Sequence, residues 1–522
     1  MNPHAQTALA FGTGGIRALM GEGDDKINCA TIARITQGLA VWLKTQIATP
    51  LVFVGFDARI GSKEFAHTTA KVLAGNGIRV LLLSDVRPTP YISFGCVHYG
   101  CSAAVMITAS HNPAEYNGYK VYGADGGQLT GPHDSAVAEA IAQNISVSEA
   151  PLNSPLIEKV GDDLDAEYLH ALLPLQKQPE QNKSLGASLR VVYTNLHGVG
   201  ITLVPQALRM WGFTDLCTVK AQSVPDGHFP TVRFPNPEYP EALSLGILDM
   251  QKENADILIA TDPDADRMGA AIMHKGKSVI LTGNELAVLF LAYICRFPLP
   301  SHPFAVKTLV TTDLCHQIAK EHGLACFDVL TGFKYIAEKI HRLKNHTFVF
   351  GAEESYGYLF SSYTRDKDAI AAACLVSEMA LDAKIHGETL VDRLKEIYKT
   401  YGMYRQKQLS ISCEEGSVHA IMQTLRRHLP SHLCGFTVTK VQDFILPVAD
   451  LPSADMIAFD CSAGMRLIVR PSGTEPKIKL YASLYAPPSS DIEKAQTDCD
   501  KQLEALLVAA SDMLSRGQRT DV

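Results

Sequence analysis

A run of mostly apolar residues at 51–57, Leu-Val-Phe-Val-Gly-Phe-Asp, is followed by a helical stretch near residues 62–75 and a second apolar run at 79–83, Arg-Val-Leu-Leu-Leu. The same order of segments begins again at Leu189 and a third time at Ala305. Strand, helix and strand at this spacing predict right-handed crossovers in a mostly parallel sheet. The chain is therefore predicted to be an α/β protein with three similar domains, each built on a mixed, mostly parallel sheet.

Each repeat supplies a third apolar run that ends in a polar loop. Residues 105–107 precede a loop with a serine, 257–260 precede one with three aspartates, and 348–350 precede one with two glutamates. Open α/β sheets carry their chemistry at the carboxyl ends of their strands. We therefore expect the three repeats to present three different loops from equivalent strand ends.

The chain from about residue 402 has a different pattern. Residues 465–470 and 477–482 resemble adjacent strands around a Pro-Ser-Gly-Thr turn, and a helix is expected near 491–515. This part is predicted to be a smaller C-terminal α+β domain. Polar, proline-rich passages near 151–186 and 298–303 are interpreted as linkers. The predicted domains are 1–186 with the serine loop, 187–300 with the aspartate loop, 301–401 with the glutamate loop, and 402–522.

Length and composition limit the classes of function. The chain has 522 residues, which suggests three or four domains at roughly 100–200 residues each. Its net charge of −8 gives no global attraction to nucleic acid. No apolar run reaches the roughly 20 residues of a membrane span, and no signal peptide is evident at the start. The 12 cysteines form no CxxC pair, which favours a reducing, cytoplasmic setting without disulfides.

The serine loop reads Thr-Ala-Ser-His-Asn-Pro at 108–113. Ser110 is a candidate nucleophile with His111 beside it. Asn117-Gly118 is a strong turn signal, so the chain is predicted to reverse there and bring Lys120 back toward Ser110. The alternative is that Ser110 only caps a turn, since serine is a favoured capping residue.

The aspartate loop places carboxylates at alternate positions, Asp262, Asp264 and Asp266. Such carboxylates repel one another unless a cation lies among them, and an all-oxygen set suits a hard cation such as Mg²⁺. The loop lacks the spacing of an EF-hand. A solvated acidic turn is the alternative interpretation.

Three further loops complete the set of candidates. The segment 351–357 offers Glu353 and Ser355, which can bind the hydroxyls of a sugar. The segment 470–477, Arg-Pro-Ser-Gly-Thr-Glu-Pro-Lys, has the composition of an anion-binding turn with an arginine beside it. A glycine-rich turn at 12–17 ends in Arg17. A cation loop, a serine loop and two phosphate-suited loops in one chain indicate phosphoryl transfer.

These motifs resemble those of the α-D-phosphohexomutases. The pattern TASHNPxxxNGxK lies at 108–120, DPDADR at 262–267 and RPSGTEP at 470–476, so that the resemblance covers nearly the whole chain. The segments 12–17, 194–200 and 331–334 are most similar to the phosphoglucomutase/phosphopentomutase branch. Two departures stand out: Ala352 lies where many members pass directly from glycine to glutamate, and only 11 residues precede Gly12.

The resemblance implies four domains around a central cleft and a resting enzyme that carries a phosphate on Ser110. It implies that Arg17, His111 and Lys120 flank the reacting phosphate, with the general base left open between His111 and Lys120. Ser110 and the three aspartates would hold Mg²⁺. The implied substrate-binding residues are Arg267, Thr331, Gly332, Lys334, Glu353 and Ser355. The implied phosphate-binding residues are Arg470, Ser472, Gly473, Thr474 and Lys479.

The implied reaction interconverts glucose 1-phosphate and glucose 6-phosphate, with glucose 1,6-bisphosphate as intermediate and activator. Three related activities remain open: phosphopentomutase, phosphomannomutase and hexose-bisphosphate synthase. The sequence does not separate them, because the geometry of the loops determines which arrangement of sugar hydroxyls is bound. A serine-nucleophile phosphatase and an inactive sugar-phosphate binder are the alternatives from other classes. The expected partners are small sugar phosphates, with no nucleic acid and no membrane, and the protein is expected to be a monomer or homodimer.

Overall fold

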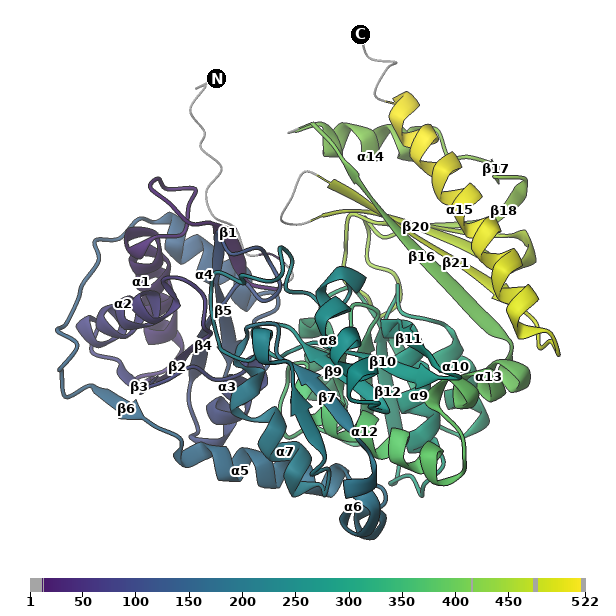
Figure 1. The fold of residues 1–522 in the computed structure, drawn as a ribbon. Helices are drawn as coiled ribbons and strands as arrows, with labels where there is room; N and C mark the ends of the chain where they lie inside the picture. Colours follow the sequence, from purple (N-terminus) through teal and green to yellow (C-terminus); the bar gives the residue numbers. More distant parts are fainter. Residues whose placement is uncertain (1–11, 13, 415, 473–476, 518–522) are drawn as a thin grey trace. The chain divides into compact units, whose positions relative to one another are not determined.

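The computed structural model describes residues 12, 14–414, 416–472 and 477–517, and the chain forms two compact units (Figure 1). One comprises Met1–Val306 and Gly332–Val391, and the other comprises Lys307–Thr331 and Asp392–Val522. No helix among the described residues is long and apolar enough to cross a membrane. All 12 cysteines are unpaired, as expected.

The first sheet has six strands in the order β1-β5-β4-β2-β3-β6. β4, β2, β3 and β6 run parallel, whereas β5 is antiparallel to both of its neighbours, β1 and β4. β4 is fully buried along its length, as its continuous apolar run predicts for a central parallel strand. The strands are β1 (Ile16–Leu19), β2 (Leu51–Phe56), β3 (Arg79–Leu83), β4 (Ala103–Ile107), β5 (Tyr116–Gly123) and β6 (Ile157–Val160). The accompanying helices are α1 (Cys29–Gln46), α2 (Ser62–Gly75), α3 (Thr89–His98) and α4 (His133–Ala142).

The predicted turn at Asn117-Gly118 is wrong, because both residues lie inside β5. The chain reverses earlier, through hydrogen-bonded turns at 109–112 and 113–116. The Asn117 side chain is buried and donates to the carbonyl of Ile60 and to Ser62 Oγ. A Cβ on Gly118 would lie 2.5 Å from the Ile16 carbonyl oxygen, so this glycine permits close strand packing.

The predicted linker at 151–186 is also wrong. It contains β6, α5 (Asp163–Leu172) and α6 (Pro179–Leu185). β6 pairs in parallel with β3, with Val80 opposite Ile157. α5 buries one apolar face, although its other side is polar enough to suggest a linker: the buried residues are Leu164, Tyr168, Leu169 and Leu172.

The second sheet has five strands in the order β11-β10-β9-β7-β8. β9, β7 and β8 are parallel, and β10 and β11 continue the sheet as antiparallel strands. The strands are β7 (Val191–Thr194), β8 (Leu216–Thr218), β9 (Ile257–Thr261), β10 (Met268–His274) and β11 (Lys277–Leu281). The helices of this region are α7 (Val204–Met210), α8 (Pro240–Lys252) and α9 (Gly283–Cys295). β9 therefore ends where the aspartate loop begins.

A four-stranded sheet is built from β12 (Pro303–Thr308), β13 (Ala325–Val329), β14 (Thr347–Glu353) and β15 (Gly357–Leu359). The helices of the same stretch are α10 (Leu314–Glu321), α11 (Phe333–Arg342), α12 (Ala369–Ile385) and α13 (Leu390–Tyr401). With this third copy, the prediction of three α/β domains with mixed sheets is confirmed.

The C-terminal sheet has six strands in the order β16-β21-β20-β19-β18-β17, and its neighbouring strands pair antiparallel. The long helix α15 (Ile492–Gly517) packs along β16 and β21 (Figure 1). This is the smaller α+β domain that the sequence predicts. The remaining elements are β16 (Met403–Ser412), α14 (Ser417–Arg427), β17 (His432–Leu433), β18 (Phe436–Asp443), β19 (Ile457–Cys461), β20 (Met465–Pro471) and β21 (Lys477–Ala486).

Candidate active site

Ser110 lies directly beyond the end of β4, in a left-handed backbone conformation with a φ of 52°. Its side chain is buried, and its N–H donates to Thr108 Oγ1 at 2.8 Å. The hydroxyl donates to Asp262 Oδ2 at 2.9 Å and lies 3.1 Å from His111 Nδ1. The predicted serine and aspartate loops therefore meet at this hydroxyl.

The aspartate loop brings its three predicted carboxylates together, with one oxygen of each within 4.8 Å of the others. Oδ1 of Asp262 accepts the N–H groups of Asp266 and Arg267, both at 3.0 Å, which fixes the loop. The Oδ1 atoms of Asp264 and Asp266 are buried and accept no hydrogen bond from any described residue. A buried carboxylate oxygen without a partner is costly unless a cation binds it.

Two ammonium groups lie beside these carboxylates. Lys120, on β5, places Nζ 2.8 Å from Asp264 Oδ2 and 3.1 Å from Asp266 Oδ2. Lys367 places Nζ 3.3 Å from Asp266 Oδ2 and 3.3 Å from Asp366 Oδ1. Lys120 thus returns on the strand after the serine loop, as predicted, and its ammonium group contacts the aspartate loop.

Two of the three predicted arginines, Arg17 and Arg267, belong to segments beside this centre. Arg17, on β1, donates from Nη1 to Asn112 Oδ1 at 3.1 Å, within the serine loop. Arg267 ends the aspartate loop, and its Nη1 lies 3.8 Å from Glu238 Oε2. Both residues are partly buried, and the Arg267 side chain is 14% exposed.

The electrostatics of the centre follow from burial and from these neighbours. Burial, together with Asp264 and Asp266, raises the pKa of Asp262 well above its ordinary value. Although burial opposes the charged form, Lys120 and Lys367 hold the pKa of Asp266 below its ordinary value. The pKa of Lys367 is raised, because its acidic neighbours outweigh its own burial. The surroundings of Asp262 therefore disfavour its charged form, and a cation bound among the three carboxylates would offset that cost.

These residues fit a hard divalent cation. The donors are carboxylate oxygens from one tight loop, two of which have no hydrogen-bond partner, and a serine hydroxyl lies at hydrogen-bond distance from the third aspartate. Mg²⁺ prefers such oxygen donors and completes its shell with water and phosphate oxygens. The observation supports the predicted metal loop over a solvated acidic turn, since all three aspartates are buried.

The predicted sugar-binding loops have well-defined anchors. Glu353, at the end of β14, is buried, and its Oε1 accepts the N–H of Gly332 at 2.9 Å. Lys334, near the start of α11, donates to Asp134 Oδ2 at 3.2 Å. The other two predicted residues of these loops are half-buried: Thr331 and Ser355.

The C-terminal segment predicted to bind an anion lies between β20 and β21. Arg470 and Lys479 face each other across this antiparallel pair, so two cationic side chains share one face of the hairpin. The Ser472 N–H donates to the Lys477 carbonyl at 2.8 Å and closes the hairpin at its strand ends. Two predicted phosphate-binding residues lie outside the described residues: Gly473 and Thr474.

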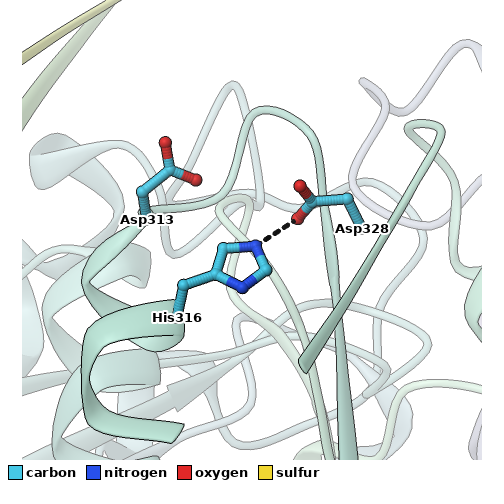
Figure 2. Close-up of side chains that lie close together, drawn as sticks. All are labelled: Asp313, His316 and Asp328. Atoms are coloured by element: carbon cyan, nitrogen blue, oxygen red, sulfur yellow. Dashed lines mark hydrogen bonds and ion pairs between the residues drawn. The ribbon is translucent and has the colours of Figure 1, made fainter. Parts of the chain in front are cut away.

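A second group of metal-ligating side chains lies elsewhere in the chain (Figure 2). It consists of Asp313, His316 and Asp328, and the sequence did not predict it. Lys307 Nζ lies 2.8 Å from Asp313 Oδ1 and 2.8 Å from Asp328 Oδ1, while His316 Nε2 lies 3.0 Å from the same Asp328 oxygen. Lys307 lies against both carboxylates, and the bond to Asp328 raises the pKa of His316 to about 10, so the two acids already have cationic partners within the chain and the group is an ion-pair network.

Sequence reasoning missed two further groups at the candidate site. Lys367 lies in a Thr-Arg-Asp-Lys-Asp segment whose only signal is alternating charge, which is usually a solvated face. Arg59 follows β2 and donates to carbonyl groups of the serine loop. Neither residue belongs to the motifs, and a sequence gives no measure of which loop a distant side chain reaches.

The fold and the centre define a class: an enzyme of phosphoryl transfer assembled from repeated α/β domains. Three family models match in chain order, all described as phosphoglucomutase/phosphomannomutase: α/β/α domain I over residues 8–148, domain II over 166–276 and domain III over 282–401. The chain therefore belongs to this family, on its phosphoglucomutase side, and is an intramolecular phosphotransferase of that isomerase type.

Individual relatives agree with this assignment. A phosphoglucomutase of Staphylococcus haemolyticus is 37% identical over 507 residues, which cover 92% of this chain and 91% of that protein. A phosphoglucomutase of Staphylococcus aureus (strain USA300) is 35% identical over 526 residues, covering 93% and 91%.

Solved structures show the same fold at lower identity. Paramecium parafusin, a phosphoglucomutase, has a TM-score of 0.73 at 18% identity and covers 99% of this chain and 96% of its own. A phosphoglucomutase/phosphomannomutase family protein of Burkholderia thailandensis has a TM-score of 0.70 at 18% identity, with coverage of 95% and 97%.

Proposed function

We propose that this protein interconverts glucose 1-phosphate and glucose 6-phosphate by passing a phosphoryl group through Ser110. The observation that carries the proposal is the environment of the Ser110 hydroxyl, which lies beside a histidine and donates to an aspartate of a buried acidic loop. The names of the two staphylococcal relatives support glucose phosphates as the substrate.

In the proposed reaction, phosphorylated Ser110 donates its phosphoryl group to a hydroxyl of the bound sugar phosphate, which forms glucose 1,6-bisphosphate. The bisphosphate then turns and returns its other phosphoryl group to Ser110. Lys120, Lys367 and Arg17 supply positive charge around the reacting group, where phosphoryl transfer needs positioning and charge stabilisation. His111 lies at hydrogen-bond distance from the Ser110 oxygen and can hold a proton there.

Asp262, Asp264 and Asp266 would hold Mg²⁺, with a phosphate oxygen on Ser110 as a further ligand. When bound, the ion supplies charge neutralisation for the phosphate oxygens. The two lysines remain paired with the loop, so the acidic loop positions cationic donors as well as the metal.

The remaining residues would recognise the substrate. Lys334, Glu353 and Ser355, with Arg267, Thr331 and Gly332, would contact the sugar and its substituents. Arg470 and Lys479 share one face of their hairpin and would hold the phosphate that is not being transferred, together with Ser472, Gly473 and Thr474. We further propose a cytoplasmic location, which the 12 unpaired cysteines support, and a monomer or homodimer that acts on small molecules.

Phosphorus NMR tests the reaction directly. The purified protein is mixed with Mg²⁺, catalytic glucose 1,6-bisphosphate and glucose 1-phosphate, beside samples that contain ribose 1-phosphate or mannose 1-phosphate. We expect rapid appearance of glucose 6-phosphate without inorganic phosphate. Conversion of only the pentose or only the mannose phosphate would replace glucose as the substrate, and release of inorganic phosphate would contradict a mutase.

The variant Ser110→Ala tests the phosphoserine. It should abolish turnover while sugar-phosphate binding by calorimetry is retained, because the nucleophile is lost and the binding residues remain. Ser102→Ala is the matched control, since Ser102 lies just before the opposite end of the same strand and accepts the Leu51 N–H at 3.2 Å. Turnover by Ser110→Ala at the wild-type rate would exclude Ser110 from the reaction.

A further inference from the structure

The conformation of Ser110 requires a support. Its φ of 52° lies in the left-handed region, which a residue with a Cβ adopts rarely, and its side chain is 1% exposed. Such a conformation persists only where the surrounding structure determines it, and it is enriched at functional sites. The direction of the hydroxyl toward Asp262 depends on this backbone geometry.

The guanidinium of Arg59 lies behind the serine loop and donates to its backbone. Nη2 donates to the carbonyl oxygen of Ser110 at 2.5 Å and also to that of Asn112. Nη1 donates to the carbonyl oxygens of Pro113 at 2.8 Å and Tyr116 at 3.1 Å. One buried side chain therefore donates hydrogen bonds to four backbone carbonyl groups in and beside the loop that carries the serine.

Asp57 connects Arg59 to the other side of the same loop. Its Oδ2 lies 3.4 Å from Arg59 Nε and accepts the Thr108 hydroxyl at 2.6 Å. Thr108 Oγ1 in turn accepts the Ser110 N–H at 2.8 Å. Both backbone polar groups of Ser110 are thus held by one continuous network, its N–H through Thr108 and Asp57 and its C=O through Arg59.

The shape of the donor matters as much as its charge. A guanidinium is planar and presents donors in a fixed fork, whereas an ammonium is a single point with three donors. A lysine at position 59 would retain the positive charge opposite Asp57 but could not reach all four carbonyls. Arg59 also lies 4.9 Å from the centre of the Phe229 ring, which restricts the plane of the guanidinium.

We propose that Arg59 is a positioning residue for the phosphoryl-carrying serine: its guanidinium fork holds Ser110 in the left-handed conformation that aims the hydroxyl at the aspartate loop. This inference rests on the proposed function, and it adds a residue outside the motifs to the machinery of that reaction. The role is geometric, since Arg59 donates to backbone carbonyls of this loop.

The test compares Arg59→Lys with Arg87→Lys. Arg87 is a matched control because it is buried in the same unit and forms a two-bond pair with Asp165. Steady-state kinetics give kcat and KM, and intact-protein mass spectrometry gives the rate at which glucose 1,6-bisphosphate phosphorylates Ser110. For Arg59→Lys we expect kcat and the phosphorylation rate to fall about a hundred-fold with KM unchanged, the cost of a displaced reacting group. Arg87→Lys should retain the wild-type kcat.

Thermal unfolding followed by circular dichroism separates positioning from folding. If Arg59→Lys unfolds at a lower temperature but retains wild-type kcat and phosphorylation rate, the proposal is overturned. Arg59→Gln serves as a second variant if the lysine form does not fold, and failure of both to fold would assign Arg59 to stability alone and also overturn it. Ser110→Ala, measured in parallel, tests the proposed function separately.

Discussion

The molecule contains two clusters of close acidic side chains that differ in what neutralises them. In the aspartate loop, three carboxylates are buried and two of their oxygens have no hydrogen-bond partner among the described residues. In the cluster of Asp313, His316 and Asp328, the carboxylates are about one-third exposed and Lys307 lies 2.8 Å from each. Proximity of acids is common to both clusters, so it does not by itself indicate a metal site.

The positions of the lysines also differ between the two clusters. Lys120 and Lys367 contact Oδ2 atoms of the aspartate loop, and the Oδ1 atoms of Asp264 and Asp266 accept no hydrogen bond from any described residue. Lys307 instead lies between its two aspartates and also donates to the carbonyl of Thr311 at 3.1 Å. The first arrangement leaves donors available to a further cation, whereas the second already contains its cation.

The largest expected difference concerns Mg²⁺. Asp264→Asn removes one ionised carboxylate of the aspartate loop, and we expect activity to fall about a thousand-fold, with more Mg²⁺ needed for half-maximal rate. Asp313→Asn makes the same chemical change in the other cluster and should leave both quantities unchanged. Mutase assays across a Mg²⁺ titration check this. An equal effect of both substitutions would remove the distinction between the clusters.

The second prediction concerns Lys307, which is 1% exposed. Lys307→Met leaves Asp313 and Asp328 without their shared counter-charge, and we expect the free energy of unfolding to fall by about 3 kcal/mol. Lys407→Met, which breaks an exposed pair with Glu504 in the same unit, should cost no more than about 0.5 kcal/mol. Urea denaturation measures both. If Zn²⁺ then stabilises Lys307→Met but not the wild-type protein, the second cluster can bind a metal ion once Lys307 is removed. The lysine alone would then distinguish the two clusters.

The smallest effect concerns pH and His316. Its hydrogen bond to Asp328 raises the pKa of His316 from 6.5 to about 10. A raised pKa in the folded state stabilises the protein below pH 6.5, and this contribution disappears as the pH rises toward 10. Because 35% of the side chain is exposed, we expect the loss to be only about 1 kcal/mol.

His316→Gln provides the comparison for this prediction, since it retains a polar side chain that does not titrate. Urea denaturation at pH 6, 8 and 10 should show a steeper decline of stability for the wild-type protein than for the variant. Parallel declines in the two proteins would show that the Asp328–His316 pair does not couple stability to pH.

The amino-acid sequence alone determined the α/β repeats and most of the candidate chemistry. Buried strands require continuous apolar runs. The loops that follow them carry Ser110 and the three aspartates in short contiguous motifs, which can be recognised without knowing the fold. The same local reasoning failed at Asn117-Gly118, because the pairing of β5 with β1 and β4 overrides a turn preference there. It also failed at 151–186, where apolar residues at helical spacing are diluted by polar ones.

Only the tertiary structure decided which distant groups complete the centre. Arg59 lies 51 residues from Ser110 and Lys367 lies about a hundred residues from Asp266, yet each makes a direct contact there. The tertiary structure also decided that Lys307 occupies the second acidic cluster. Ion pairs and hydrogen bonds depend on distances of a few ångströms between atoms. Those distances are set by how the segments pack, and the number of residues between two segments does not predict them.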